Sequence, residues 1–536
     1  MKRRDFIAAT AGALALAGCD APQSIEGGFT GIDVARGHAL RDGALSGASN
    51  SSTPTMVRRT RVVIAGGGVA GLAAARALRQ SGIEDFVLLE LEDSAGGNSR
   101  GGTLEGIACP LGAHYLPVPG DDASEVQDLL EELGLRQRVS GRWEYDERNL
   151  CHSPQERLFF QGEWQEGLLP VHGVTESTLA QYRLFALRVE ALQHETRFVI
   201  PMAKIAATPE MLALDALSFA AWLDCEGLVD AHLRWYLDYC CRDDYGAGLA
   251  HVSAWAGIHY FASRHGFHAP GDDSGERDAV LTWPEGNAWL ARRMAAPLGD
   301  RIKVAHAVTR IAETRSGVEV DAFDVSTKTK VRWEAERCIV ALPVFIAARV
   351  VENPPAVLRN AVANVRYAPW LVANVHLRAP LADNGRGAAP SWDNLVFGTR
   401  GLGYVDARHQ ALDPTPAPTV LSWYRPLGPG INDIDQGGGD GRKLLLDRPW
   451  TAWRDDLLAE LSAPHPDLPL LATRIDITRY GHAMAIPTPG LLNQLDAGQK
   501  RQRITSGRLA FAHADWSGYS IFEEAFTRGH FAGVAT

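Results

Sequence analysis

The stretch from Arg61 to Arg100 constrains the fold more than any other part of the chain. An apolar β-branched run at 62–64 ends at a cluster of glycines, and a helical Ala/Leu pattern follows to Gln80. A second apolar run then ends on Glu90, where a carboxylate can accept hydrogen bonds from an adenosine ribose. This order is typical of a βαβ unit that binds a dinucleotide. The alternative is a glycine-rich turn in another kind of α/β protein.

Each residue of the glycine cluster has its own role in such a unit. Gly66 allows the tight turn, Gly68 lets the backbone approach a pyrophosphate, and Gly71 lets the helix pack on the strand. The helix begins at Val69 and Ala70, whose end of the helix carries free N–H groups and the positive end of the helix dipole. We therefore predict that these residues bind the phosphates of the cofactor.

The residues after Glu90 distinguish between dinucleotides. Gly96-Gly97 comes next, followed by Asn98-Ser99-Arg100. Here the sequence resembles the FAD-dependent amine oxidase superfamily, which includes monoamine and polyamine oxidases, protoporphyrinogen oxidase and carotenoid desaturases. The family has Gly-Gly-Arg at this distance, so Asn98 stands where an Arg is usual and Arg100 lies two places on. The resemblance implies FAD rather than NAD, with Gly97, Asn98 and Arg100 beside it.

Three further segments match the same family. Gly112, Ala113 and His114 resemble a Gly-Ala segment that leads towards the flavin face, where small residues allow close approach to the ring. The family has a strand whose valine-like residue meets the adenine, and Val308 takes that place. An apolar strand that ends in Ala-x-Pro matches 337–343. His114 either faces the flavin or is a structural histidine.

The closing stretch, 508–533, resembles the second FAD signature of the family. In that signature an acid, here Asp515, pairs with the ribityl or phosphate region, and a helix that begins near Ile521 and Phe522 meets the pyrophosphate. Trp516-Ser517-Gly518-Tyr519 resembles the segment whose tyrosine forms one side of an aromatic cage before the flavin. Tyr480 stands where a tryptophan is usual, near the ring. A core position is the alternative for Tyr519.

The substrate side is less specific. Residues 233–264 are dense in aromatic and polar groups, which suits the wall of a pocket in which Asp243 and Asp244 attract an ammonium. A helical core hairpin with solvated acids is an equally good interpretation. Amine-oxidising members of the family commonly carry a lysine in a strand beside the flavin, and the alignment puts Val372 there. That departure weakens the case for amine oxidation but leaves flavin chemistry intact.

The chain has 536 residues, which favours two domains. The resemblance implies a Rossmann-like FAD-binding domain and a discontinuous mixed α+β substrate domain. The predicted segments are a signal at 1–19, a flexible tether at 20–56, an FAD-binding domain at 57–115 with 280–345 and 480–536, and a substrate domain at 116–279 with 346–479. Within the last of these, Asp383 to Asp447 is rich in Gly, Pro and Asp and is predicted to form loops.

The N-terminus carries export signals. Arg3-Arg4-Asp5-Phe6-Ile7 resembles a twin-arginine signal, and the apolar run that follows is too short for a permanent membrane span. Leu16-Ala17-Gly18-Cys19 resembles a lipoprotein box in which Cys19 would be acylated. We expect export by the twin-arginine machinery and a periplasmic, lipid-anchored protein. An ordinary cleaved signal or a chance basic start is the alternative.

Composition excludes several other classes. The net charge of −11 argues against nucleic acid as a partner but does not exclude cationic substrates. The seven cysteines form no spacing suited to zinc, so no metal site is predicted. No Ser/His/Asp or P-loop pattern competes with the flavin motifs.

These observations predict an FAD-dependent oxidoreductase. The leading expectation is oxidation of a small-molecule amine by hydride transfer to flavin N5, with oxygen or a respiratory acceptor taking up the electrons. Dehydrogenation of an apolar or cyclic substrate is an alternative within the family. A different class is also open, namely an exported flavin-binding protein without catalysis.

Overall fold

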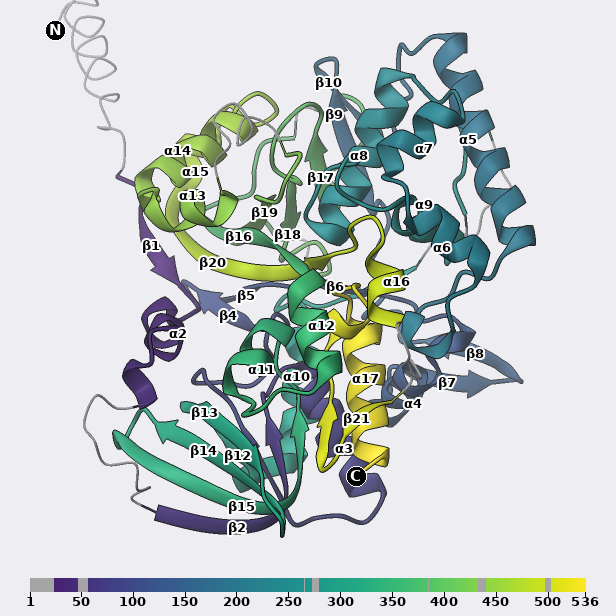
Figure 1. The fold of residues 1–536 in the computed structure, drawn as a ribbon. Helices are drawn as coiled ribbons and strands as arrows, with labels where there is room; N and C mark the ends of the chain where they lie inside the picture. Colours follow the sequence, from purple (N-terminus) through teal and green to yellow (C-terminus); the bar gives the residue numbers. More distant parts are fainter. Residues whose placement is uncertain are drawn as a thin grey trace, which may run out of the picture.

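The computed structural model places two eight-stranded sheets one above the other (Figure 1). The structure describes residues 24–46, 56–264, 266–271, 279–383, 385–411, 413, 415–431, 440–496 and 503–536. The predicted signal, with its arginine pair and Cys19, lies outside the described residues.

The first sheet, which we call the parallel sheet, contains the predicted βαβ unit. Its neighbouring strands β12, β3, β2, β15 and β22 all run parallel. A hairpin of β13 and β14 is antiparallel to the first half of β15, and β21 is antiparallel to β22. The bounds are β12 (Ile302–Lys303), β3 (Phe86–Leu89), β2 (Met56–Ala65), β15 (Thr329–Val340), β22 (Leu509–Phe511), β13 (His306–Glu313), β14 (Val318–Asp324) and β21 (Ile504–Ser506).

Helices cover both faces of the parallel sheet, as an all-parallel arrangement requires. On β2, Val62 and Ile64 face one layer of helices while Val63 and Ala65 face the other. The first layer is α3 (Val69–Gln80), α4 (Ser124–Glu132), α10 (Ala288–Ala295) and α17 (Phe522–Val534), and the second is α11 (Val344–Val350) with α12 (Ala356–Asn364).

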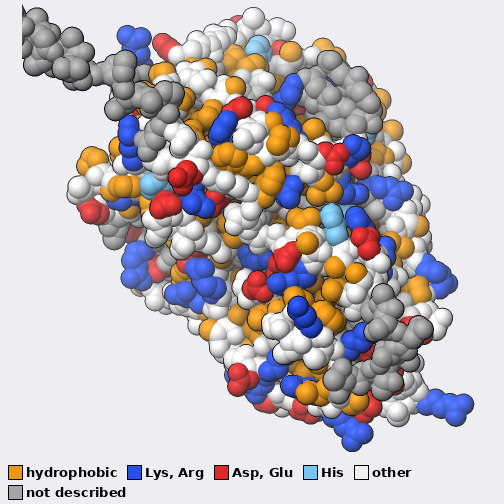
Figure 2. Space-filling view, turned by 90° about the vertical axis from the view of Figure 1, so that its left-hand side faces the viewer, with side chains coloured by type: hydrophobic (Ala, Val, Ile, Leu, Met, Phe, Trp, Pro, Cys, Tyr) orange, Lys and Arg blue, Asp and Glu red, His pale blue; other side chains and the backbone are white. Residues whose placement is uncertain are grey.

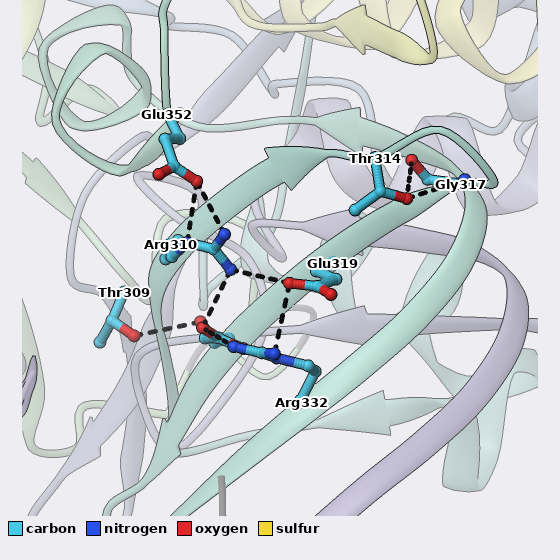
Figure 3. Close-up of polar contacts among 8 residues, drawn as sticks. Thr309, Arg310, Thr314, Gly317, Glu319, Arg332 and Glu352 are labelled. Atoms are coloured by element: carbon cyan, nitrogen blue, oxygen red, sulfur yellow. Dashed lines mark hydrogen bonds and ion pairs between the residues drawn. The ribbon is translucent and has the colours of Figure 1, made fainter. Parts of the chain in front are cut away.

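An ion-pair network ties the β13–β14 hairpin to its neighbours (Figure 3). Arg310 on β13 contacts Glu319 on β14 at 3.0 Å and Glu352, which follows α11, at 2.7 Å. Arg332 on β15 contacts Asp321 on β14 at 2.6 Å. These side chains are partly exposed, so each pair contributes little alone, and the network mainly fixes the register of the three strands.

The second sheet, which we call the mixed sheet, has the order β1–β20–β16–β19–β18–β17–β9–β10. Its central neighbours are antiparallel, whereas β1 with β20 and β17 with β9 are parallel. The bounds are β1 (Glu26–Thr30), β20 (Ala472–Ile486), β16 (Arg366–Leu377), β19 (Thr419–Pro426), β18 (Tyr404–Asp406), β17 (Asp393–Val396), β9 (Glu156–Phe160) and β10 (Glu163–Glu166).

Alternation along β16 separates the two faces of the mixed sheet. Leu371 and Ala373 pack on one helical layer, and Trp370 and Val372 point to the other side. The first layer is α13 (Gly441–Asp447), α14 (Trp450–Leu461) and α15 (Leu468–Leu471). The other side holds α5 (Glu176–Glu195), α6 (Pro209–Asp215), α7 (Phe219–Cys225), α8 (Ala231–Tyr245) and α9 (Ala254–Ala262) (Figure 1).

Shorter elements connect these layers. They are α2 (Val34–Arg41), α16 (Leu491–Asp496) and the strand pairs β4 (Gly101–Leu104) with β5 (Ile107–Pro110), β6 (Tyr115–Pro117) with β11 (Val280–Thr282), and β7 (Arg136–Val139) with β8 (Arg142–Tyr145). No helix among the described residues is long and apolar enough to cross a membrane.

The α/β fold class is confirmed, but the predicted tether at 20–56 is wrong for its middle part. Residues 26–30 form β1, which adds a parallel edge strand to β20, and α2 follows. The side chain of Asp33 caps α2 by accepting a hydrogen bond from the Arg36 N–H. Residues 26–30 are a strand because they pair with the distant strand β20, and a Gly/Ser-rich composition does not predict such pairing.

The loops predicted between Asp383 and Asp447 are also wrong in part. This region contains β17, β18 and all of β19, which is buried along its whole length between β16 and β18. It contains α13 as well. Segments rich in Gly and Pro separate these strands. The average composition of 383–447 therefore predicted loops and did not reveal the strands.

The structure differs from the predicted domain boundaries in three places. Helix α4 packs with α17 in the helical layer on the parallel sheet, although its residues were assigned to the substrate domain. Helices α11 and α12 also pack on the parallel sheet. Strand β20 crosses the predicted boundary at Tyr480 and pairs with β16 on both sides of it.

Charge is mixed rather than concentrated on one face of the molecule. On the face drawn in Figure 2, acidic and basic side chains are interspersed with hydrophobic ones. The net charge of −11 therefore does not gather into a single-sign field on this face.

Close packing of α3 on α17 gives a first prediction. A Cβ on Gly529 would lie 2.0 Å from the Ala70 carbonyl oxygen, so the helices would have to separate. We expect Gly529→Ala to lower the free energy of unfolding by about 1–3 kcal/mol, as overpacking does. Thermal unfolding of the wild type and the variant measures this change in stability.

Gly37→Ala is the matched control, since Gly37 is also helical and a Cβ there meets nothing within 4 Å. Equal melting temperatures for the two variants would contradict the prediction.

Candidate active site

The parallel strands β2, β3, β15 and β22 end at one edge of their sheet, and the segments that follow them enclose an elongated cavity of about 330 Å³. We call it the long cavity. Ligands of open α/β sheets bind at such an edge. Of the residues predicted to bind FAD, those that line the long cavity are Gly66, Gly68, Val69, Ala70, Glu90, Gly97, Asn98, Arg100, Ala113, Val308, Asp515, Ile521 and Phe522.

Two predicted residues lie beside the long cavity rather than on its wall. A Cβ on Gly71 would lie 1.9 Å from the Gly66 carbonyl oxygen, so Gly71 is where the helix packs on the turn. Gly112 lines a neighbouring cavity, and a Cβ there would lie 2.1 Å from the Asn98 carbonyl oxygen. Both positions require glycine because backbone approaches closely.

Glu90 closes the glycine turn at one end of the long cavity. Its Oε2 accepts a hydrogen bond from the Gly67 N–H at 2.8 Å, and its Oε1 accepts one from the Glu92 N–H at 2.8 Å. Burial raises the pKa of Glu90, against the effect of these two donors. Gly66 has a φ of +103°, which L side chains rarely adopt. The carboxylate is thus held rigidly where the ribose of an adenosine would lie.

Helix N-termini occupy the middle of the long cavity. α3 and α17 pack side by side, with Gly529 against Ala70 and Gly533 against Ala74. This pairing makes the helices parallel, so the N-termini of both point into the same cavity. Free N–H groups and two positive dipole ends suit a pyrophosphate.

Asp515 lies near these N-termini and is held by two donors and a neighbouring imidazole. Its carboxylate accepts hydrogen bonds from the Val344 N–H at 2.9 Å and the Tyr367 hydroxyl at 2.5 Å. His513 Nδ1 lies 3.0 Å from its other oxygen. Burial alone would raise the pKa of Asp515, but these partners outweigh burial and lower it. The side chain is therefore a fixed anion at neutral pH.

Asn98 and Arg100 also face the long cavity, although their own side chains are engaged. Asn98 Nδ2 donates to the Ala483 carbonyl at 2.7 Å, and Arg100 Nε donates to the Gly97 carbonyl at 3.0 Å. Arg100 lies 3.6 Å from Glu92. The backbone turn is thereby braced, and the guanidinium remains on the cavity wall.

A second cavity, of about 160 Å³, continues from the first, and we call it the short cavity. Residues that line both are Asn98, Ala113, Asn287, Ala483, Ser520, Ile521 and Phe522. Its remaining wall combines aromatic rings with carboxyl groups. This is the arrangement expected of a substrate pocket beside a cofactor.

Two tyrosines flank Gly112 in the short cavity. The Tyr480 hydroxyl donates to the Leu111 carbonyl at 2.7 Å, and the Tyr424 hydroxyl donates to the Gly112 carbonyl at 3.1 Å. Sequence analysis predicted Tyr480 but missed Tyr424, because β19 lies in the region expected to form loops. Trp370, on the neighbouring β16, was missed as well.

His114 lines the short cavity and is packed among rings. Its imidazole lies 4.5 Å from the Tyr424 ring, 4.9 Å from Tyr115 and 5.3 Å from Trp392, between ring centroids. Burial lowers the pKa of His114 to about 3. It is therefore neutral at physiological pH and serves as a flat, uncharged wall.

The prediction that Tyr519 faces the flavin is not supported. Tyr519 lines neither cavity and is 1 % exposed in the core, with its ring 5.8 Å from Tyr245 and 5.0 Å from His259. Gly518 adopts a φ of +75° and turns the chain so that Ser520, rather than Tyr519, reaches the cavities.

Both interpretations of residues 233–264 hold in part. The segment forms the helical hairpin of α8 and α9, whose rings fill the core. At its ends, however, Asp243, Asp244 and Arg264 line the short cavity together with Glu523 of α17. Arg264 lies 3.5 Å from Asp244. Burial raises the pKa of Asp243 to about 7 and that of Glu523 to about 7.

Val372 lines the short cavity, as the alignment predicted. None of the described residues that line either cavity is a lysine. Among the described residues, no group of three or more His, Cys, Asp or Glu side chains is arranged to hold a metal ion.

The long cavity runs from the carboxyl group of Glu90 past two helix N-termini and then opens on an aromatic pocket, which is the order expected for the adenosine, pyrophosphate and ring of FAD. The class is thus that of FAD-binding proteins. A family model described as flavin containing amine oxidoreductase matches residues 69–436, and the chain belongs to this family. FAD is its cofactor.

Two curated relatives share part of the chain. The L-amino acid dehydrogenase of Synechocystis sp. is 27 % identical over 313 residues, which are 55 % of this chain and 58 % of the relative. The putative flavin-containing monoamine oxidase AofH of Mycobacterium tuberculosis is 27 % identical over 296 residues, 55 % of this chain and 59 % of the relative. The matches therefore span little more than half of these relatives.

Solved structures agree over a larger share. Putrescine oxidase bound to putrescine has a TM-score of 0.68 at 19 % identity and covers 89 % of this chain and 99 % of its own. Cyclohexylamine oxidase from Brevibacterium oxydans has a TM-score of 0.63 at 19 % identity, with 89 % and 98 % covered. At this identity the likeness establishes the fold alone.

The two acceptor oxygens of Glu90 lead to a prediction. Glu90→Gln keeps the size but leaves one acceptor for two N–H donors, so one of them loses its partner. We expect FAD affinity to fall about tenfold, because the amide also offers the ribose one acceptor fewer, and such a hydrogen bond is worth about 1–2 kcal/mol. Titration of the apoprotein with FAD measures it. Glu84→Gln, an exposed acid just before the same strand, is the control, and an unchanged affinity in Glu90→Gln would refute the role.

The raised pKa of Glu523 predicts how stability depends on pH. The folded state binds this proton more tightly than the unfolded chain, so the contribution favours folding at low pH and is lost as pH rises from about 4.5 to about 7. Glu523→Gln removes it. We expect the melting temperature of the wild type to fall more steeply than that of the variant over this range. Glu163→Gln, on the surface, is the control, and parallel curves for wild type and Glu523→Gln would contradict the prediction.

Proposed function

We propose that this protein oxidises the C–N bond of an amine to an imine, which water then hydrolyses. FAD supplies the oxidising power by accepting a hydride from the carbon that carries the nitrogen. The observation that carries this proposal is the composition of the short cavity. Its wall combines aromatic rings, three carboxyl groups and one arginine, and it adjoins the long cavity. Among the described residues, Arg264 pairs with Asp244 alone, so an apolar substrate would leave the buried Glu523 without a cationic partner.

The wall of the short cavity performs two tasks. The carboxyl groups attract the ammonium form, which predominates in water. The rings of Tyr480, Tyr424 and Trp370 then surround the reacting end, exclude water and disfavour charge, so that the amine gives up its proton before oxidation. His114 stays neutral there and adds no competing positive charge.

The substitution of a lysine by Val372 does not oppose this function. Val372 keeps the wall beside the cofactor apolar, and the aromatic and acidic groups that recognise an amine come from β16, β19, α8 and α17. The electron acceptor that completes the cycle is proposed to be oxygen or a respiratory carrier. We also propose twin-arginine export and a lipid anchor at Cys19, on the strength of the N-terminal motifs alone.

An anaerobic screen tests the proposed function. Purified holoenzyme is mixed with aliphatic amines, aromatic amines, diamines and amino acids while the flavin absorbance is followed. We expect at least one amine to bleach the flavin, and air should then restore the colour with release of aldehyde and ammonia. Bleaching by apolar or cyclic compounds without an amino group, and by no amine, would instead favour a desaturase, and no bleaching by any compound would favour a flavin-binding protein without catalysis.

A further inference from the structure

We propose that residues 24–46, which we call the N-terminal strap, close the adenosine end of the long cavity and retain FAD there. The strap consists of β1, α2 and the helical turn Ala44–Ser46. Gly37 and Leu40 of α2 line the long cavity, although the sequence predicted a tether here and no cofactor contact. This inference rests on FAD as the cofactor and does not depend on which substrate is oxidised.

Three hydrogen bonds hold α2 against the turn that follows β3. Arg36 Nη1 donates to the Leu91 carbonyl at 2.9 Å and to the Asp93 carboxylate at 3.0 Å. The Asp33 N–H, at the start of α2, donates to the Glu92 carboxylate at 3.3 Å. This turn comes directly after the acid that is expected to bind the ribose, so α2 lies against the adenosine end of the cavity.

The strap is anchored to both sheets (Figure 1). Strand β1 pairs with β20 along its whole length, and the Arg479 guanidinium lies 3.7 Å from the centroid of the Phe29 ring. After α2, the Arg41 carbonyl accepts a hydrogen bond from Arg349 of α11, which packs on the parallel sheet. Helix α2 is therefore held on the cavity wall between an anchor on the mixed sheet and one on the parallel sheet.

Gly37 is the residue of α2 that most clearly points to a ligand. It lies inside the helix, where glycine is less favourable than alanine, and it lines the long cavity. A Cβ at this position would meet no neighbouring element within 4 Å, whereas a Cβ on Gly529 would lie 2.0 Å from backbone. Packing of the protein on itself therefore does not require a glycine here. The open space beside the helix backbone suits a ligand that fills it.

The character of this end of the cavity agrees with an adenosine. Leu40 is 7 % exposed and belongs to the same apolar cluster as Val308, and both line the cavity together with Ile346. An apolar wall beside a ribose-binding acid suits a purine base, which buries a flat apolar surface. The strap thus supplies a part of the adenosine site that none of the FAD motifs contains.

The contacts of the strap explain how it would retain the cofactor. FAD loses the wall formed by Gly37 and Leu40 only when α2 leaves the turn, so its dissociation includes a local opening of the strap. Part of the anchor is in contact with water, since the Arg36 side chain is 11 % exposed and that of Asp93 is 79 % exposed. Opening of α2 alone therefore requires less free energy than unfolding, and the anchors determine how often it occurs.

The rate at which FAD leaves the holoenzyme is the first test. Diluted holoenzyme is sampled over time, and free flavin is separated from bound flavin. We expect Arg36→Gln to release FAD at least about tenfold faster than the wild type, because two charge-assisted hydrogen bonds of α2 are lost. Arg41→Gln is the matched control. It removes the same charge from the same helix, but the Arg41 side chain pairs with its neighbour Asp42 rather than with the turn, so its release rate should equal that of the wild type.

A second test uses ADP, which carries the adenosine and two phosphates without the flavin ring. Gly37→Phe places a ring in the open space on the cavity wall. We expect calorimetry to show that its apoprotein binds ADP at least about tenfold more weakly than the wild type, with an unchanged melting temperature. Gly28→Phe is the control, because Gly28 also belongs to the strap and has open space at its Cβ, but does not line the cavity.

The outcomes decide the proposal independently of amine oxidation. A release rate in Arg36→Gln equal to that of the wild type, or equal ADP affinities in Gly37→Phe and Gly28→Phe, would overturn the strap. If Arg36→Gln also lowers the melting temperature of the apoprotein, the ADP titration of Gly37→Phe decides the question. Neither measurement contains an amine, so the proposed function can fail while the strap is supported, and the strap can fail while amines still bleach the flavin.

Discussion

The contact between α3 and α17 is the constraint on which the cofactor cavity depends. Gly529 and Gly533 let the two helices approach until backbone meets backbone at Ala70 and Ala74. Because the pairing is parallel, both N-termini open on the same edge of the parallel sheet. Two ends of the chain that are far apart in sequence thus build one anion site, which neither helix would form alone.

Local signals in the sequence predicted one half of this arrangement well. Local sequence determines the turn at Gly66, the helix that follows it and the acid Glu90. Their pattern can therefore be recognised in the sequence. Asp515 was recognisable because a strand and a helix flank it in the same order as in the family. The α/β class was predicted from the same βαβ unit. In the structure, the parallel sheet brings Gly66, Glu90 and Asp515 to one cavity.

The residues of the short cavity were harder to predict from the sequence, for a physical reason. Tyr424 enters the short cavity only because β19 pairs with β16, and strand pairing across distant segments leaves little local trace. The prediction for Tyr519 was not supported for the opposite reason. Its motif is present in the sequence, but the turn at Gly518 directs the ring into the core. Nothing in the sequence distinguishes Glu523 from Glu524. Both are buried, but Glu523 lines the short cavity, whereas Glu524 accepts hydrogen bonds from the Ser517 hydroxyl and the Met202 N–H.

The position of Glu523 links substrate recognition to cofactor binding. Glu523 is the second residue of α17, whose N-terminus faces the long cavity, so a single rigid element connects the wall of the short cavity to the cofactor site.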